Sequence, residues 1–299
     1  MTKQAKHQLG FAAVCAIALL CEWRALADTF SLSLRDYQYT YLLLILPISA
    51  ALVVLEWRNL MTTIRLSLRA GSVCLAVAAM TECLSLGWLA PLPSDVQLSI
   101  RMLALVLGCI GAFLLCFGPQ VARRVFFPLC FLLAFVPLPK SLINPIGTLL
   151  QEATAWTAHA LFSACGVPVL QDGVLLTIPD LTLQVAQECS SIRSSSMLLV
   201  TTIVVAHLLL RSPWRKAVVI GFAVPMSIAK NGLRIFTIAM LTTRVDPDYL
   251  TGKLHHQGGI VFFAIALMCI FALLWVLRKS EDSSIKPSLS PVDANAVGG

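Results

Sequence analysis

The chain has 299 residues, of which 58% are hydrophobic and 12% charged, and its mean hydropathy is +0.84. This composition excludes an ordinary water-soluble domain and is typical of a protein that crosses a membrane several times. The net charge of +7 could indicate a nucleic-acid partner, but the basic residues are scattered through short loops between apolar runs. Membrane topology explains that distribution better, so we predict an all-α polytopic membrane protein with no nucleic-acid partner.

The first 122 residues contain four apolar runs, each interpreted as a transmembrane helix, since a span needs roughly 20 apolar residues. The runs cover residues 9–21, 39–55, 70–90 and 102–117. The first run could instead be a cleaved signal peptide, but no small-residue cleavage site precedes a soluble domain. We therefore expect an anchor helix there.

The next region, residues 123–279, combines four more spans with one long polar connection. The spans cover residues 125–138, 195–210, 217–241 and 259–277, and the first of them is short. We predict an interfacial helix for residues 144–165. Residues 167–187 alternate apolar and polar side chains around Asp172-Gly173 and Pro179-Asp180, a pattern that predicts a small hairpin or loop platform leading into Cys189. The tail, residues 280–299, is rich in Ser, Pro, Asp and Ala and is expected to be disordered.

Basic residues collect in alternate loops of these eight spans, which orients the chain. The basic loops carry Lys3 and Lys6; Arg58, Arg65 and Arg69; Arg123 and Arg124; Arg211, Arg215 and Lys216; and Arg278 and Lys279. We expect both termini to be cytoplasmic and the segment 140–188 to lie on the outer face.

A polar interruption, residues 185–196, leads into the sixth span and contains Cys189 between Glu188 and Arg193, with five serines. Eight of the ten cysteines lie in apolar runs without metal-type spacing and are interpreted as core residues; only Cys165 and Cys189 have polar neighbours. A thiol reacts as its thiolate, and the ordinary thiol pKa of about 8.5 falls near a cation. Residue Cys189 is therefore a candidate nucleophile.

The predicted topology brings two further groups to the same face as Cys189. The seventh span carries Lys230 and Arg234 in its outward half, where a cation costs about 3 kcal/mol or more unless it is paired or wetted. The chain then re-enters the membrane at His255-His256. An imidazole can move the proton of a thiol, and a guanidinium can hold a developing oxyanion.

Each of these residues also has a simpler interpretation. Arg234 could be a structural residue that extends to the interface. The histidine pair could anchor the helix at the interface or bind zinc with Cys189, although no fourth ligand has suitable spacing. Arg193 could tune the thiol or pair with Glu188. The intramembrane Glu82 could be a protonated or hydrogen-bonded acid.

The region 123–263 resembles the exosortase and archaeosortase family of membrane-embedded cysteine transpeptidases. The resemblance is carried by Arg124-Val125-Phe126-Phe127-Pro128, Pro137-Leu138-Pro139, Gly166-Val167-Pro168-Val169, Cys189-Ser190-Ser191-Ile192-Arg193-Ser194, Asn231-Gly232-Leu233-Arg234-Ile235, and His255 with Gly259 and Phe263. It implies catalytic Cys189, Arg234 and His255. The supporting candidates are Arg193, Asn231, Ser190 and His256, and no metal or cofactor is expected. One departure is Ser191, where the family usually has Gly.

The resemblance further implies a function. The expected substrate is an exported protein whose C-terminal sorting tail, similar to the PEP-CTERM type, has a short motif, a transmembrane helix and a basic cluster. Cleavage through a thioester at the outer face of the inner membrane would transfer the protein to an envelope acceptor. The alternatives are a transporter with Arg234, Lys230 and Glu82 along its path, or a non-catalytic factor for envelope or exopolysaccharide assembly. No internal repeat of the broken-helix type favours the transporter.

Overall fold

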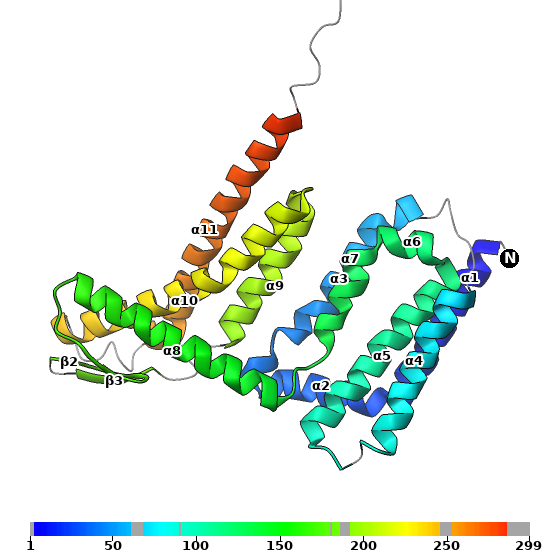
Figure 1. Cartoon of the computed structure of the whole chain (residues 1–299), viewed down its shortest axis with the longest axis horizontal. Coiled ribbons are helices and arrows are strands. Elements are labelled where there is room, and N and C mark those ends of the chain that lie inside the picture. The colour runs from blue at the N-terminus through cyan, green and yellow to red at the C-terminus, as the bar shows by residue number, and fades with distance from the viewer. Residues whose placement is uncertain are drawn as a thin grey trace, which may run out of the picture. The chain divides into compact units, whose positions relative to one another are not determined.

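The protein is an all-α polytopic membrane protein, as the composition predicts. A computed structural model describes residues 3–60, 68–89, 91–179, 181–185, 192–245 and 253–285, and it divides into two compact units, Met1–Pro145 and Ile146–Gly299 (Figure 1). Within the described residues, six helices are long and apolar enough to span a membrane. The count rises to eight if each of two bent helix pairs is taken as one span.

The N-terminal unit is entirely helical in its described part. Its elements are α1 (Lys3–Cys21), α2 (Trp23–Arg35), η1 (Tyr37–Tyr39), α3 (Leu42–Leu60), α4 (Leu68–Leu86), α5 (Ser94–Phe117), α6 (Pro119–Arg124), α7 (Phe126–Leu132) and η2 (Leu133–Phe135). Helices α4 and α5 approach closely: a methyl group placed on Gly71 would lie only 2.5 Å from Cα of Leu115. Small residues at such contacts allow membrane helices to pack backbone against backbone.

An ion cluster in this unit accounts for Glu82. The guanidinium of Arg101 lies 2.9 Å from the carboxylate of Glu22 and 3.4 Å from that of Glu82. Residue Glu22 is buried at the junction of α1 and α2, where the two helices are bent by 72°. Because charges in the membrane require partners, we assign Glu82 a structural role in this cluster.

The segment Pro137-Leu138-Pro139 lies at the end of the fifth apolar run and directly precedes helix α8 (Lys140–Ala164). Proline disfavours helical backbone in the residue before it, so the chain bends by 93° between η2 and α8. Backbone carbonyls at this bend accept side-chain donors instead of helical ones: Ser99 Oγ donates to Pro137 O at 2.7 Å, and Tyr39 Oη donates to Leu138 O at 2.9 Å.

The predicted platform exists, but it has three strands rather than a single hairpin. Strands β1 (Leu170–Asp172), β2 (Leu175–Ile178) and β3 (Leu181–Gln184) form an antiparallel sheet in the order β1-β2-β3. The register pairs Asp172 with Leu175 across a turn in which Gly173 has φ +58°. Glycine tolerates this backbone conformation, as the Asp-Gly pair predicted.

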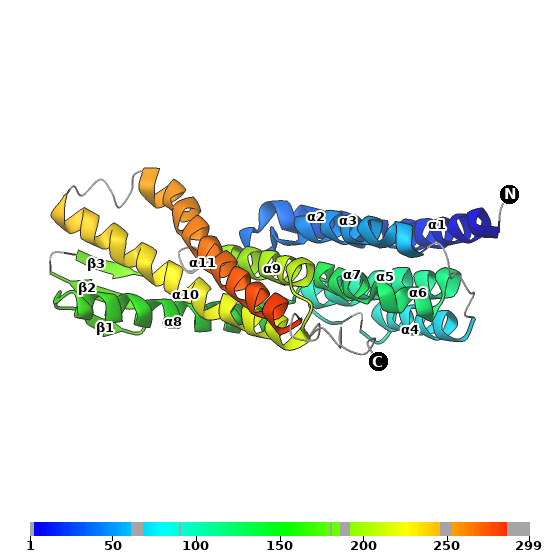
Figure 2. The same cartoon turned by 90° about the horizontal axis from the view of Figure 1, so that it is seen from above.

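The sheet packs against α8 and α10, and these elements share one core (Figure 2). Its buried members are Ala155, Ala158, Phe162, Leu176, Ile178, Val185, Ile235 and Ala239. Figure 1 shows α8 and the sheet together at the end of the C-terminal unit at which α9 and α11 begin. The platform is therefore built onto the part of α10 that carries Arg234.

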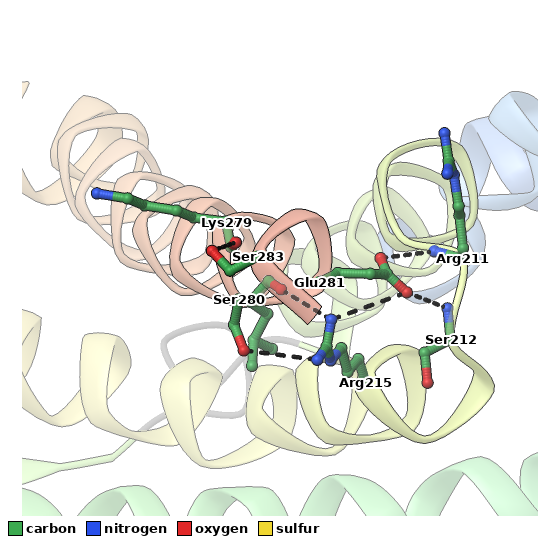
Figure 3. Close-up of polar contacts among 8 residues, drawn as sticks. Arg211, Ser212, Arg215, Lys279, Ser280, Glu281 and Ser283 are labelled. Atoms are coloured by element: carbon green, nitrogen blue, oxygen red, sulfur yellow. Dashed lines mark hydrogen bonds and ion pairs between the residues drawn. The ribbon is translucent and has the colours of Figure 1, made fainter. Parts of the chain in front are cut away.

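Three long helices complete the C-terminal unit: α9 (Ile192–Leu209), α10 (Pro213–Arg244) and α11 (Lys253–Ile285). At the end of this group away from the platform, the Glu281 carboxylate accepts backbone N–H groups of Arg211 at 3.0 Å and Ser212 at 2.7 Å (Figure 3). Arg215 lies 3.9 Å from the same carboxylate and donates to Leu277 O at 3.3 Å. These contacts join α11 to the α9–α10 loop.

The expectation of disorder from residue 280 onward is wrong for its first part. Helix α11 continues to Ile285, because Glu281 satisfies backbone N–H groups that the start of α10 leaves without helical partners. Residues 286–299 lie outside the described part of the chain.

Candidate active site

The polar segment that carries the candidate nucleophile is attached to α8 on both sides. Residues 186–191, including Cys189 and Ser190, lie outside the described part of the chain, whereas Val185 and Ile192 are described. The Gln151 side-chain amide donates to Val185 O. One helical turn earlier, a methyl group on Gly147 would lie 3.0 Å from Cδ1 of Ile192. The described residues on either side of the segment therefore both contact α8: Val185 at Gln151 and Ile192 at Gly147.

A buried polar network joins the first turn of α9 to α10. Lys230, only 5% exposed, donates from Nζ to Ser194 Oγ and to Asn231 Oδ1, both at 2.8 Å. Beside it, Ser227 Oγ donates to Ser195 Oγ at 2.7 Å. The supporting candidate Asn231 is thus an acceptor for Lys230, and two other members of the network, Ser194 and Ser195, belong to the polar interruption 185–196.

The sequence indicated Lys230 as a costly intramembrane cation but could not indicate its partners. Lys230 and Ser194 are 36 residues apart in the chain. An ammonium group next to two neutral oxygens is better accommodated in a low-dielectric region than one without acceptors. The network therefore holds α9 against α10 immediately after the segment that contains Cys189.

Arg234 lies one helical turn beyond Lys230 on α10, and its guanidinium approaches α11. A methyl group placed on Gly259 would lie 3.9 Å from Nη1 and 4.0 Å from Cζ of Arg234. Position 255 precedes Gly259 by four residues on the same helix, so both lie on one face of α11. Position 256 precedes Gly259 by three residues and lies about 60° from it on the other side, so position 255, at about 40°, is the nearer of the two. The side chains of His255 and His256 lie outside the described part.

The glycine of the Asn231-Gly232-Leu233-Arg234 motif has a packing role that the sequence did not reveal. A methyl group on Gly232 would lie 2.6 Å from Cγ2 of Thr157 on α8. Such a short approach excludes a side chain and brings α10 directly onto α8. The same helix therefore packs on α8 through Gly232 and faces α11 through Arg234.

Two other residues singled out by the sequence have described positions. Arg193 is exposed in the first turn of α9, next to the candidate segment. Cys165 is exposed directly after α8. Among the described side chains, no group of three or more His, Cys, Asp and Glu residues could hold a metal ion. The zinc interpretation involved Cys189, His255 and His256, whose side chains are not among them.

Comparison with known proteins gives the family. The sequence pattern of the transmembrane exosortases matches residues 31–272, which extends well before the region 123–263 that carries the resemblance. No curated protein and no solved structure matches the chain. Because the match covers most of the sequence, including all of α9 and α10, the chain belongs to the transmembrane exosortase family.

Proposed function

We propose that this protein is a membrane-embedded cysteine transpeptidase that cleaves the C-terminal sorting signal of exported proteins. The observation that carries the proposal is the convergence on α10. Lys230 holds the helix that begins just after the Cys189 segment, and one turn later Arg234 lies beside the face of α11 that includes position 255. Family membership supports the same assignment.

In the proposed reaction, the thiolate of Cys189 attacks the scissile carbonyl and forms a C–S bond. Arg234 donates hydrogen bonds to the oxyanion, and the C–N bond breaks as the imidazolium of His255 gives its proton to the leaving amine. The tail departs and the exported protein remains as a thioester. An envelope acceptor then attacks the thioester carbonyl and gives its proton to the neutral imidazole of His255; the C–S bond breaks, which regenerates the thiolate and the imidazolium. The substrate tail would be similar to the PEP-CTERM type.

The proposed setting is the inner membrane, with both termini cytoplasmic and the α8 platform on the outer face. The distribution of Lys and Arg among the loops supports this orientation. The basic residues Arg211, Arg215 and Lys279 gather around the Glu281 contacts, as expected for a cytoplasmic end (Figure 3).

The test compares two cysteines. Cys189→Ala should abolish cleavage of a tailed substrate in cells, and Cys165→Ala should leave cleavage close to wild type, because Cys165 is exposed but has no proposed role. An impermeant maleimide added to intact cells should label Cys189 ahead of Cys165, since only the former has a cationic partner in the proposed site. Cleavage that persists in Cys189→Ala would remove the proposed chemistry and favour a non-catalytic assembly role.

A second prediction concerns Lys230. Lys230→Met removes the unfavourable burial of a cation, but it also takes a donor from Ser194 Oγ and Asn231 Oδ1. Each effect is on the order of a few kcal/mol and they have opposite signs, so the protein should still insert and fold. Substrate cleavage should nevertheless fall by about 10-fold or more, because small misplacements of catalytic groups are expensive. The measurement is the cleavage rate of purified protein in vesicles, together with its thermal unfolding.

The matched control is Ser227→Ala, which removes the neighbouring Ser227–Ser195 hydrogen bond and keeps both contacts of Lys230. Equal losses in the two variants would mean that any polar contact between α9 and α10 is sufficient. Lys230→Arg should recover part of the rate, because it restores donors near Ser194.

A further inference from the structure

Helix α8 presents three different faces. One face packs on the sheet and α10 through Gln151, Ala155, Ala158 and Phe162. The opposite face carries the exposed apolar side chains Ile146, Leu149 and Trp156, which fall within an arc of about 80° at 100° per residue. Between them runs a polar strip of Thr148, Glu152 and His159. A helix with protein, lipid and water faces is suited to lie in the plane of a membrane surface.

A groove of about 560 Å³ separates the polar strip of α8 from the edge of the sheet. Its lining includes Glu152, Trp156, His159, Leu170, Gln171 and Gly173, and we call this cavity the Trp156 groove. Trp156 and Leu170 are both 71% exposed and form its apolar walls. Strand β1 is the edge of the sheet, so its outer side offers backbone groups to an added extended chain.

The Trp156 groove adjoins the point where the chain enters the Cys189 segment. The last described residue before that segment, Val185, donates its N–H to Val174 O at 2.9 Å and accepts from Gln151. Val174 follows Gly173 and Gln151 precedes Glu152, and both of these neighbours line the groove. Both residues that bond to Val185 are therefore chain neighbours of residues that line the groove.

We propose that the Trp156 groove binds the extended peptide of the exported protein that lies immediately outside its transmembrane helix. The inference rests on the proposed function. Trp156 belongs both to the lipid-facing stripe of α8 and to the groove, so the groove opens toward lipid. A substrate anchored by its own helix remains in the bilayer and can enter from that side. Its backbone would pair with β1 and its apolar side chains would contact Trp156 and Leu170.

Site-specific photo-cross-linking tests this assignment in the full-length protein. A benzoyl-phenylalanine replaces Trp156 in a Cys189→Ser background, where a tagged substrate with its sorting tail stays uncleaved. The matched control places the same group at Trp275 on α11, which is 64% exposed. We expect a strong substrate cross-link from position 156 and little from position 275. Equal yields, or cross-links from position 156 to lipid alone, would overturn the proposal.

Kinetics give a second, independent readout. Trp156→Ala should raise KM for the tailed substrate by about 10-fold with little change in kcat, because aromatic anchors dominate the energetics of peptide contacts. Trp275→Ala should change neither constant. A fall in kcat alone would contradict a binding role. If position 156 cross-links to the substrate but cleavage persists in Cys189→Ala, the proposed chemistry is overturned and the groove assignment stands. If cleavage requires Cys189 but position 156 gives no substrate cross-link, only the groove assignment is overturned.

Discussion

Replacing Arg234 by Lys should lower the rate of substrate cleavage by about 100-fold or more, as the loss of one oxyanion donor does in other enzymes. Lysine keeps the positive charge but lacks the planar fork of donors that holds an oxygen in fixed geometry. The Arg234 guanidinium lies beside Gly259, whose missing side chain leaves room for it on α11. If charge alone promotes the thiolate, Lys would retain most of the activity instead.

Two measurements separate these outcomes. The first is single-turnover cleavage of a tailed substrate, and the second is the alkylation rate of Cys189 in the absence of substrate. For Arg234→Lys we expect slow cleavage with near-normal alkylation. Arg244→Lys is the matched control, because Arg244 is exposed at the end of the same helix. Normal cleavage by a folded, inserted Arg234→Ala protein would leave Arg234 as a structural interface residue.

The two adjacent histidines should differ sharply. His255→Ala should reduce cleavage by roughly 10²- to 10⁴-fold, the usual contribution of a positioned general acid or base, whereas His256→Ala should retain most of it. The family resemblance favours His255, and so does helical geometry, since position 255 lies about 40° around α11 from Gly259, which adjoins Arg234, and position 256 about 60° from it on the other side. Cleavage rates of the two variants in vesicles, at equal inserted amounts, are the measurement.

Each histidine variant serves as the other's control, since both remove an imidazole from the same turn. A larger loss in His256→Ala would move the proton carrier by one position, to the other side of Gly259 on α11. Equal, small losses in both would indicate that the pair acts only as an interfacial anchor.

Hydropathy and turn chemistry determined the large features of this protein. Apolar runs of roughly 20 residues can be recognised one at a time, because a helix in lipid satisfies its own backbone hydrogen bonds. The Asp172-Gly173 turn was equally local, since Gly173 adopts its left-handed conformation without help from distant residues. The short motifs around Cys189, Arg234 and His255 identified the family in the same way, through their order along the chain.

Hydropathy did not predict helix α2 (Trp23–Arg35), which lies between the first two apolar runs. Helix α2 has almost no net hydrophobicity and buries Ala25, Thr29 and Ser33 along one side. The hydroxyls of Thr29 and Ser33 donate back to Ala25 O and Thr29 O, so small polar residues can face a partner helix without free donors. A hydropathy window reads such a helix as a polar loop, and only the packing reveals it.

Tertiary structure decided the partners of the polar groups. Glu82 was an unexplained intramembrane acid until Arg101 was placed beside it, and Lys230 a costly cation until Ser194 was. The pairing of Gln151 with Val185 and the contact of Gly232 with Thr157 have no local pattern at all. In a low-dielectric region a polar group is stable only with a partner at about 3 Å, and sequence spacing does not determine which helix supplies that partner. The sequence by itself therefore identified the residues of the candidate site, whereas the packing of α8, α9, α10 and α11 decided which of the described ones meet.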